Sequence, residues 1–294
     1  MEDGLLQPKR SRPGAPGDRL LGMSLKRMGC LLVVSLMVLI PLGCQGRMIH
    51  PAQRYTAGKA GVVASLPPQI QPVVYHTSEG DQTSFSFVPR GPVPERLWLV
   101  CNGNASCALA WSGMLSEYGD PHAGYLLFDY PGYGVNEGSA SPFAVQEAAV
   151  AAVEAWRLHL QLSRPELDRR MGVLGHSLGA AAALQYAAVH SVRRIIVAAP
   201  FTSMVDMGHH LLFWPCGYLI WHRYDNVAQL AEIARQVPRP SIIILHGAAD
   251  TVIPPDMSAK LAQPWPEWVH RRVIAEQTHN DIAIDAVRLL HSAQ

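Results

Sequence analysis

The sequence of 294 residues is poor in charged side chains and has no excess of either sign. Charged residues make up 16% of the chain, with 24 Lys and Arg against 23 Asp and Glu. No basic stripe with interleaved aromatic residues is present, which excludes nucleic acid as a partner. Disordered chains combine low hydrophobicity with high net charge, whereas 49% of this chain is hydrophobic. The composition predicts a globular protein that buries a sizeable core.

Cysteine is also scarce, with five residues in the whole chain and no CxxC spacing. This absence argues against a zinc site, and we expect neither a metal nor a cofactor. Cys101 and Cys107 could pair in an oxidising compartment. We favour the alternative that both are ordinary thiols, because free cysteines often behave as small buried hydrophobic residues.

An apolar run over residues 29–43 follows the basic pair Lys26-Arg27. The run is short for a spanning helix, which needs ~20 apolar residues, and is typical of a signal peptide. It ends in Pro41-Leu42-Gly43-Cys44, which resembles a bacterial lipoprotein signal with Cys44 as the lipidated residue. An uncleaved membrane anchor and a buried helix are the alternatives. Met23 would give a compact basic start, so the chain begins either there or at Met1.

The chain divides into three predicted parts. Residues 1–44 form a leader that attaches the protein to a membrane of the cell envelope or directs its secretion. Residues 45–71 are rich in Pro, Gly, Ala and Gln, and we expect a linker that wraps onto the following domain. Residues 72–294 form that domain, which we expect to be monomeric.

Short apolar stretches alternate with helix-forming stretches along residues 72–294. Predicted strands cover Val73–Thr77, Thr83–Val88, Leu97–Cys101, Tyr125–Phe128, Met171–Leu174, Ile195–Ala198, Ile242–Leu245 and Arg272–Ala275. Predicted helices cover Pro142–Leu160, Leu178–His190 and Asp281–His291. This alternation predicts an α/β fold whose mostly parallel central sheet has helices on both faces. In such sheets ligands bind beyond the carboxyl ends of the strands.

A Gly-x-Ser-x-Gly pentad, Gly175-His176-Ser177-Leu178-Gly179, lies between a predicted strand and an Ala-rich predicted helix. This context is the one required for a nucleophile elbow, a tight turn that exposes the serine at the top of the sheet. The glycines let strand and helix approach each other closely. The serine then lies at a helix N-terminus, where backbone N–H groups favour negative charge. Ser177 is therefore the predicted nucleophile.

A serine hydroxyl needs a base that takes its proton, and an acid that orients the base. In this type of site the acid and then the base follow the serine in chain order. Asp250 follows the strand Ile242–Leu245, and His279 follows the last strand, so they are the predicted acid and base. We expect His246 to orient the Asp250 loop and His176 to line the site without catalysing. Asp225, Asp256 and Asp281 are rival acids.

The loop Asn102-Gly103-Asn104-Ala105-Ser106 follows a buried predicted strand. We expect it to supply one backbone N–H of an oxyanion hole from Asn104, with the second from Leu178 after the serine. The alternative is that Asn-Gly-Asn is an ordinary turn.

Five motifs in this order resemble the α/β-hydrolase domain-containing family, which includes depalmitoylating thioesterases and many bacterial esterase-like proteins. They are Asn102–Ala105, Phe128–Gly134 with Gly138-Ser139, Gly175–Gly179, His246–Asp250 and Thr278–Asn280. The resemblance covers roughly residues 72–290 and implies the α/β-hydrolase fold. It also implies that the loop Asp129–Gly134 shapes the site without joining the triad. Asn102 departs from the family, which usually has His there, and we expect retained activity with an altered oxyanion loop.

Residues 201–237 carry aromatic and aliphatic side chains around Leu211–Pro215, Tyr218–Trp221 and Tyr224, in a chain with only 7% aromatics. We expect a small helical lid, either packed as a cap or forming an apolar wall for an acyl chain. The sequence thus predicts a serine hydrolase that prefers short to medium acyl esters or thioesters over charged substrates. The alternatives are a serine peptidase of the same fold and a non-catalytic binding protein.

Overall fold

The computed structural model describes residues 45–90, 94–211, 216–291 of the chain. The predicted signal peptide, the anchor and the lipidation of Cys44 fall on residues outside these ranges and stay predictions. Within the described ranges, no helix combines the length and the apolar character that crossing a bilayer demands.

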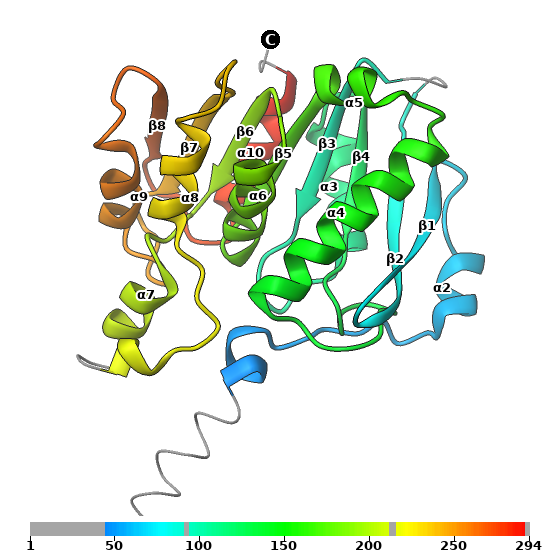
Figure 1. Cartoon of the computed structure of the whole chain (residues 1–294), viewed down its shortest axis with the longest axis horizontal. Coiled ribbons are helices and arrows are strands. Elements are labelled where there is room, and N and C mark those ends of the chain that lie inside the picture. The colour runs from blue at the N-terminus through cyan, green and yellow to red at the C-terminus, as the bar shows by residue number, and fades with distance from the viewer. Residues whose placement is uncertain (1–44, 91–93, 212–215, 292–294) are drawn as a thin grey trace, which may run out of the picture. The chain divides into compact units, whose positions relative to one another are not determined.

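The described residues form an eight-stranded sheet with the order β1-β2-β4-β3-β5-β6-β7-β8. β1 and β2 are antiparallel to each other and β2 is antiparallel to β4, whereas all pairs from β4 to β8 are parallel. The strands are β1 (Ile70–Thr77), β2 (Gly80–Phe87), β3 (Arg96–Cys101), β4 (Ala123–Phe128), β5 (Met171–His176), β6 (Arg194–Ala198), β7 (Ser241–Gly247) and β8 (Val269–Ile274). This is the predicted mostly parallel sheet, with an antiparallel hairpin at one edge (Figure 1).

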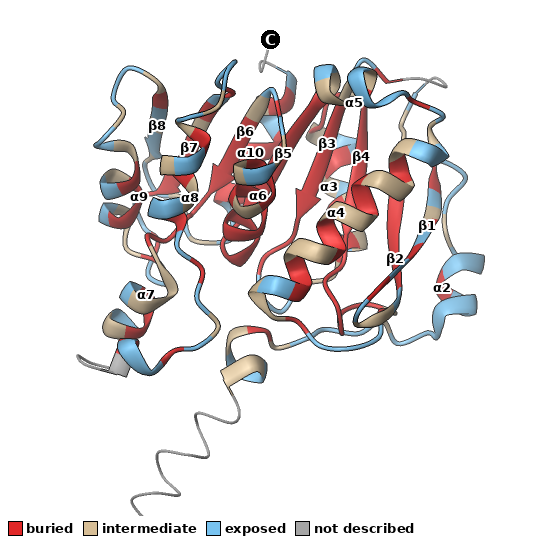
Figure 2. Ribbon diagram, in the orientation of Figure 1, coloured by how far each residue is buried: buried red, intermediate tan, exposed pale blue. Residues whose placement is uncertain are grey.

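Helices cover both faces of the sheet, as Figures 1 and 2 show. The α-helices are α2 (Lys59–Ala64), α3 (Trp111–Tyr118), α4 (Pro142–His159), α5 (Arg164–Arg170), α6 (Leu178–Val189), α7 (Met204–Leu211), α8 (Asn226–Ile233), α9 (Pro255–Ala262) and α10 (Ile282–Arg288). The short 3-10 helices are η1 (Ala108–Ala110), η2 (Cys216–Leu219) and η3 (Leu289–His291). Helices α4, α6, α8 and α9 pack into one core, and α3 and α10 pack into the other.

The two cores exist because successive side chains of a strand point to opposite faces. In β3, Leu97, Leu99 and Cys101 belong to one core while Trp98 and Val100 belong to the other. A strand covered on both faces reads as a continuous apolar run, which is why β3 is recognisable in the sequence. Figure 2 shows the buried strands in red between helices whose outer sides are exposed.

Capping side chains set several helix starts. The Ser141 hydroxyl accepts a hydrogen bond from the Ala144 N–H at 3.1 Å, and Pro142 occupies the first turn of α4 as predicted. Asp225 caps α8 in the same way through the Ala228 N–H. The rival acid Asp225 therefore has a structural role at a helix start.

The predicted strands of the edge hairpin, Val73–Thr77 and Thr83–Val88, leave residues 78–82 between them. The observed turn is shorter, because Thr77 pairs directly with Gly80, so that Ser78 and Glu79 alone form it. Gly80 has a φ of +99°, a conformation that a residue with a side chain rarely adopts. Helices α3 and α5 were not predicted, since their residues form no clear apolar period.

A segment that we call the strap, residues 45–55, runs along the edge of the domain and begins with a helical turn over residues 45–49. The Gly134 N–H donates to the carbonyl of Gln53 at 2.7 Å, so the strap is hydrogen-bonded to the Asp129–Gly134 loop. The thiol of Cys107 donates to the same carbonyl at 3.3 Å. Cys107 and the buried Cys101 are both free thiols, in agreement with the interpretation favoured from the sequence.

Candidate active site

Ser177 lies on a sharp turn between β5 and α6 with φ 56° and ψ −121°. Non-glycine residues rarely adopt positive φ, and this strain persists only where the surroundings impose it. Gly175 and Gly179 allow the close approach of strand and helix that this turn needs. A Cβ on Gly175 would collide with the Gly179 carbonyl, and a Cβ on Gly179 would collide with the Cys101 carbonyl. The turn therefore has the geometry that the pentad predicted.

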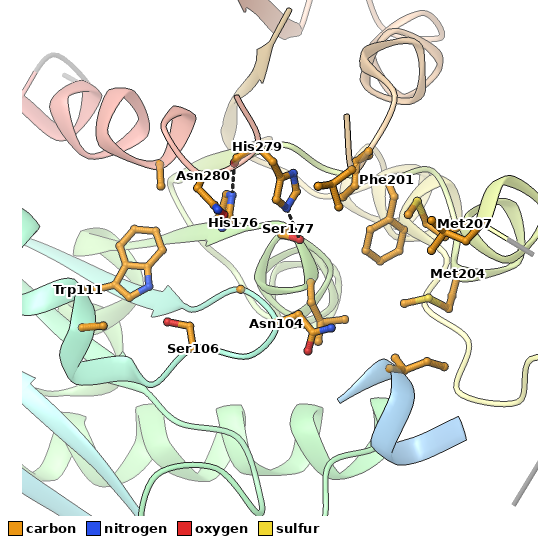
Figure 3. A pocket seen from close by; sticks show the side chains of 18 of the residues that line it. Asn104, Ser106, Trp111, His176, Ser177, Phe201, Met204, Met207, His279 and Asn280 are labelled. Atoms are coloured by element: carbon orange, nitrogen blue, oxygen red, sulfur yellow. Dashed lines mark hydrogen bonds between the residues drawn. The ribbon is translucent and has the colours of Figure 1, made fainter. Parts of the chain in front are cut away.

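The structure brings the three predicted side chains together at the carboxyl edge of the sheet. Nε2 of His279 lies 3.0 Å from Oγ of Ser177, and Nδ1 of His279 lies 2.8 Å from Oδ2 of Asp250. Figure 3 shows the His279 ring directed at Ser177. A carboxylate only accepts hydrogen bonds, so Nδ1 of His279 carries the proton toward Asp250 and Nε2 accepts from the serine. This is the tautomer that a general base requires.

The carboxylate of Asp250 is fixed by four donors. Oδ1 accepts the N–H groups of Val252 and Ile253 at 2.8 and 2.9 Å. Oδ2 faces His279 and also lies 3.3 Å from Nε2 of His246. Burial by itself would raise the pKa of Asp250, but hydrogen bonds from His246, His279 and the Ile253 N–H outweigh burial and hold that pKa well below its usual range. Asp250 is thus anionic wherever the protein is folded at ordinary pH.

His176 lines the site without reaching the serine. Its Nε2 donates to the carbonyl oxygen of His279 at 2.7 Å, and the two ring centroids are 4.9 Å apart. Burial, helped by the neighbouring His279, lowers the pKa of His176 to about 4. A neutral His176 supports the backbone of the base and adds no positive charge beside it.

The oxyanion loop carries free backbone donors. Asn104 and Leu178 both line the cavity around Ser177. Among the described residues, neither backbone N–H donates to a protein acceptor. The side chain of Asn102 closes the loop by donating from Nδ2 to the Ser106 carbonyl at 2.6 Å. The carbonyl of Asn102 in turn accepts the hydroxyl of Tyr130. Two unpaired N–H groups beside the serine can hold a developing oxyanion.

A cavity of about 510 Å³ opens from Ser177. Its walls are mostly apolar and include the side chains Met48, Ile49, Trp111, Phe201, Met204 and Met207. Figure 3 shows Phe201, Met204 and Met207 grouped on one side and Trp111 on the other. The volume is in the range of small-molecule pockets, which are usually apolar with a few convergent polar groups.

Residues 201–237 supply an apolar wall of the cavity, one of the two alternatives left open for them, but the aromatic cluster around Tyr218 does not form it. Tyr218, Leu219 and Trp221 are exposed to solvent by 58%, 48% and 73% of their surfaces, and none of them lines the cavity. Part of the predicted cluster, residues 212–215, lies outside the described residues. The lid wall is formed instead by Phe201 and by the α7 residues Met204, Met207 and Leu211.

The two remaining rival acids, Asp256 and Asp281, bind partners other than His279. Asp256 lies in the first turn of α9 and pairs with Lys260 at 3.2 Å. Asp281 accepts the hydroxyl of Thr278 at 2.6 Å and precedes α10. Neither carboxylate contacts His279 in the interactions recorded for the described residues, so Asp250 alone of the four candidates faces the base.

Three residues that line the cavity were not predicted from the sequence: Met48 and Ile49 of the strap, and Trp111 of α3. No local pattern marks them, because each reaches the cavity through contacts distant in sequence. The spacing of Met204 and Met207, three apart in an amphipathic stretch, is a signal that could have predicted the methionine wall. In the part of the chain that the structure describes, no cluster of His, Cys, Asp and Glu could hold a metal ion.

The sheet order, the strained serine after β5 and a histidine between that serine and an aspartate define an α/β-hydrolase fold with a serine-centred site. The chain belongs to the alpha/beta hydrolase family, whose sequence profile matches residues 98–292.

Comparisons with individual proteins agree with this assignment. The chain is 28% identical over 287 residues to an uncharacterized protein of Mycobacterium tuberculosis, covering 90% of this chain and 96% of that protein. The esterase Pf2001 of Pyrococcus furiosus has a similar fold, with a TM-score of 0.57, 14% identity and coverage of 83% and 92%. A puromycin-hydrolyzing peptidase of Mycobacterium tuberculosis matches with a TM-score of 0.55 and 15% identity, over 75% of this chain and 38% of that one.

Proposed function

We propose that the protein is a serine hydrolase that cleaves carboxylic esters or thioesters through an acyl-enzyme. The observation that carries this proposal is the continuous relay from Ser177 Oγ to His279 Nε2 at 3.0 Å and from His279 Nδ1 to Asp250 at 2.8 Å. A serine hydroxyl is a weak nucleophile on its own, and an adjacent oriented base is the arrangement that activates it.

The reaction proceeds in two acyl transfers. The Ser177 oxygen attacks the substrate carbonyl while Nε2 of His279 takes the hydroxyl proton. The tetrahedral oxyanion accepts hydrogen bonds from the N–H groups of Leu178 and Asn104. His279 then gives the proton to the leaving alcohol or thiol, and the acyl-enzyme forms. In the second half, His279 takes a proton from water, the hydroxide attacks the acyl-enzyme, and the proton returns to Ser177.

The anionic Asp250 stabilises the imidazolium that forms at each attack. Its low pKa keeps it charged, so it holds His279 in the required tautomer instead of accepting the proton itself. No step in this cycle needs a group that the chain does not supply.

The apolar walls of the cavity favour an uncharged acyl group as substrate, because an apolar wall offers a charged group no compensating partner. The alternatives of a peptidase and of a non-catalytic binding protein make different predictions. A peptidase of this fold would cleave peptide amides as well as esters, whereas an esterase would leave peptide amides intact, and a binding protein would leave Ser177 unreactive.

A fluorophosphonate probe tests the proposal because it labels only an activated serine. We expect labelling of the wild-type protein and hydrolysis of p-nitrophenyl esters, both lost in Ser177→Ala. Turnover in that variant should fall by ~10⁶-fold, the loss measured for removal of a triad serine. Absence of both labelling and turnover in the folded wild-type protein would overturn the proposal.

A further inference from the structure

The strap forms a part of the cavity wall beside the lid. Met48 and Ile49, on the helical turn over residues 45–49, line the cavity together with Met204 and Met207 of α7. Figure 3 shows that turn as the blue ribbon beside Met204. The strap lies outside residues 98–292, which match the family profile. The cavity is therefore completed by a segment that the shared hydrolase region does not include.

The first half of the strap is clamped to the lid. The side-chain amide of Gln45 donates from Nε2 to the Leu219 carbonyl at 2.7 Å, and its Oε1 accepts the Trp221 N–H at 2.8 Å. The nitrogen and the oxygen of one side-chain amide thus both bind backbone groups, one at the end of η2 and one just after it. His50, which ends the helical turn, is 4% exposed and packs against the rings of His222 and Tyr224, with centroids 5.6 and 5.9 Å away.

The second half of the strap is fixed to the sheet side of the site. The hydroxyl of Tyr55 donates to Oδ2 of Asp129 at 2.8 Å and accepts the Leu109 N–H at 3.1 Å. Asp129 is fully buried and its other oxygen accepts the Ala108 N–H at 2.8 Å. Because hydrogen bonds hold the strap on both sides of Met48 and Ile49, these two side chains have a fixed place in the cavity wall.

We infer that the strap determines acyl-chain specificity, with Ile49 and Met48 closing the cavity on a flexible, unbranched acyl group attached to Ser177. This inference rests on the proposed esterase function. Four of the lining side chains are methionines, whose unbranched thioether chains adapt to a flexible ligand: Met48, Met114, Met204 and Met207. An acyl methylene held between the strap and α7 is removed from water. Burial of one methylene contributes ~0.8 kcal/mol, so each methylene that the cavity cannot hold lowers the binding constant ~4-fold.

The test measures kcat/KM for p-nitrophenyl esters from acetate to dodecanoate in variants of the full chain. Ile49→Trp fills the strap side of the cavity, whereas Ile49→Ala enlarges it. Gln45→Ala removes the clamp to the lid without changing any lining side chain. Arg47→Ala is the matched control, because Arg47 is exposed on the same helical turn and does not line the cavity.

We expect Ile49→Trp to lower kcat/KM for the longest ester that the wild type accepts at least ~10-fold relative to kcat/KM for acetate, as excluding two methylenes requires. Ile49→Ala should move the preferred length upward. Gln45→Ala should flatten the length profile, and Arg47→Ala should leave it unchanged. Retained turnover of acetate shows that each variant folds and that its serine is active.

A length profile that is the same in wild type, Ile49→Trp and Ile49→Ala would overturn the inference, as would an equal loss at every chain length. Fluorophosphonate labelling separates this outcome from failure of the proposed function. Labelled, active proteins with unchanged profiles contradict only the role of the strap. Unlabelled wild-type protein without ester turnover contradicts the esterase proposal, and with it the inference.

Discussion

His246, at the end of β7, is held to the following loop that carries Asp250: Nε2 of His246 lies 3.3 Å from Oδ2 of Asp250 and 2.9 Å from the carbonyl oxygen of Ile253. Both neighbours are acceptors, so this nitrogen carries the proton. His246 is completely buried, and its ring thereby links the strand end to the far side of the acid loop. The structure supports the expectation that His246 orients the Asp250 loop.

Replacing His246 by leucine should lower kcat by roughly 10-fold, because the acid loses a buried donor and its loop loses a cross-link. His246→Gln should restore part of this loss, since its amide nitrogen can take the place of Nε2. Equal losses of kcat in the leucine and glutamine variants would assign His246 a role in packing alone.

Gly179→Ala should prevent the elbow from forming as it stands, because a Cβ at this position overlaps the Cys101 carbonyl of the neighbouring strand. Backbone cannot yield as a flexible side chain can, so we expect a loss of at least ~2 kcal/mol in the free energy of unfolding. Urea denaturation measures it. Gly113→Ala on α3 is the control, since its Cβ would meet nothing and should be tolerated.

Asn102→Ala should weaken the oxyanion loop without touching the relay. The variant loses the 2.6 Å hydrogen bond from Nδ2 to the Ser106 carbonyl, and the Asn104 N–H is no longer held in place. We expect kcat to fall by ~10-fold with little change in KM, less than the ~10²-fold that follows complete loss of an oxyanion donor. Asn104→Ala keeps its backbone donor and should lose less. Equal losses would mean that the loop acts through the Asn104 side chain.

His50 should make the protein sensitive to acid. Burial, and secondarily the neighbouring His222, lowers the pKa of His50 to about 3, and neither ring nitrogen has a hydrogen-bond partner among the described residues. The unfolded chain takes up a proton near pH 6.5 that the folded chain refuses until about pH 3. The stabilisation is therefore complete above pH 6.5 and is lost as the pH falls below it.

His50→Phe keeps the ring packing and removes this titration. Between pH 7 and 5 the free energy of unfolding should fall by ~2 kcal/mol more in the wild type than in the variant. His176, whose pKa burial lowers to about 4, acts in the same direction, and Asp129, whose pKa burial raises to about 6, acts in the opposite one. Both are present in the two proteins, so the difference isolates His50. Parallel pH curves would contradict the prediction.

The sequence was sufficient for the sheet and for the relay because both depend on local patterns. Strands covered on two faces read as apolar runs, and the elbow needs its two glycines within five residues. Asp250 and His279 could be placed because each follows a recognisable strand, and parallel strands end at one edge.

The residues of the cavity walls could not be predicted from the sequence, because they come together through contacts between distant parts of the chain. Met48 and Ile49 line the cavity of Ser177 because Gln45 and Tyr55 bind partners far along the chain, and no periodicity encodes such contacts. The prediction that the aromatic side chains around Tyr218 and Trp221 belong to the lid wall rested on composition alone. Composition does not specify which side of a short helix is buried, and these residues turn outward.

The strap also couples two parts of the molecule that lie far apart in the sequence. Gln45 binds the backbone of Leu219 and Trp221, whereas Tyr55 binds the carboxylate of Asp129. A substitution at either attachment can therefore alter the cavity wall, although neither Gln45 nor Tyr55 lines the cavity itself.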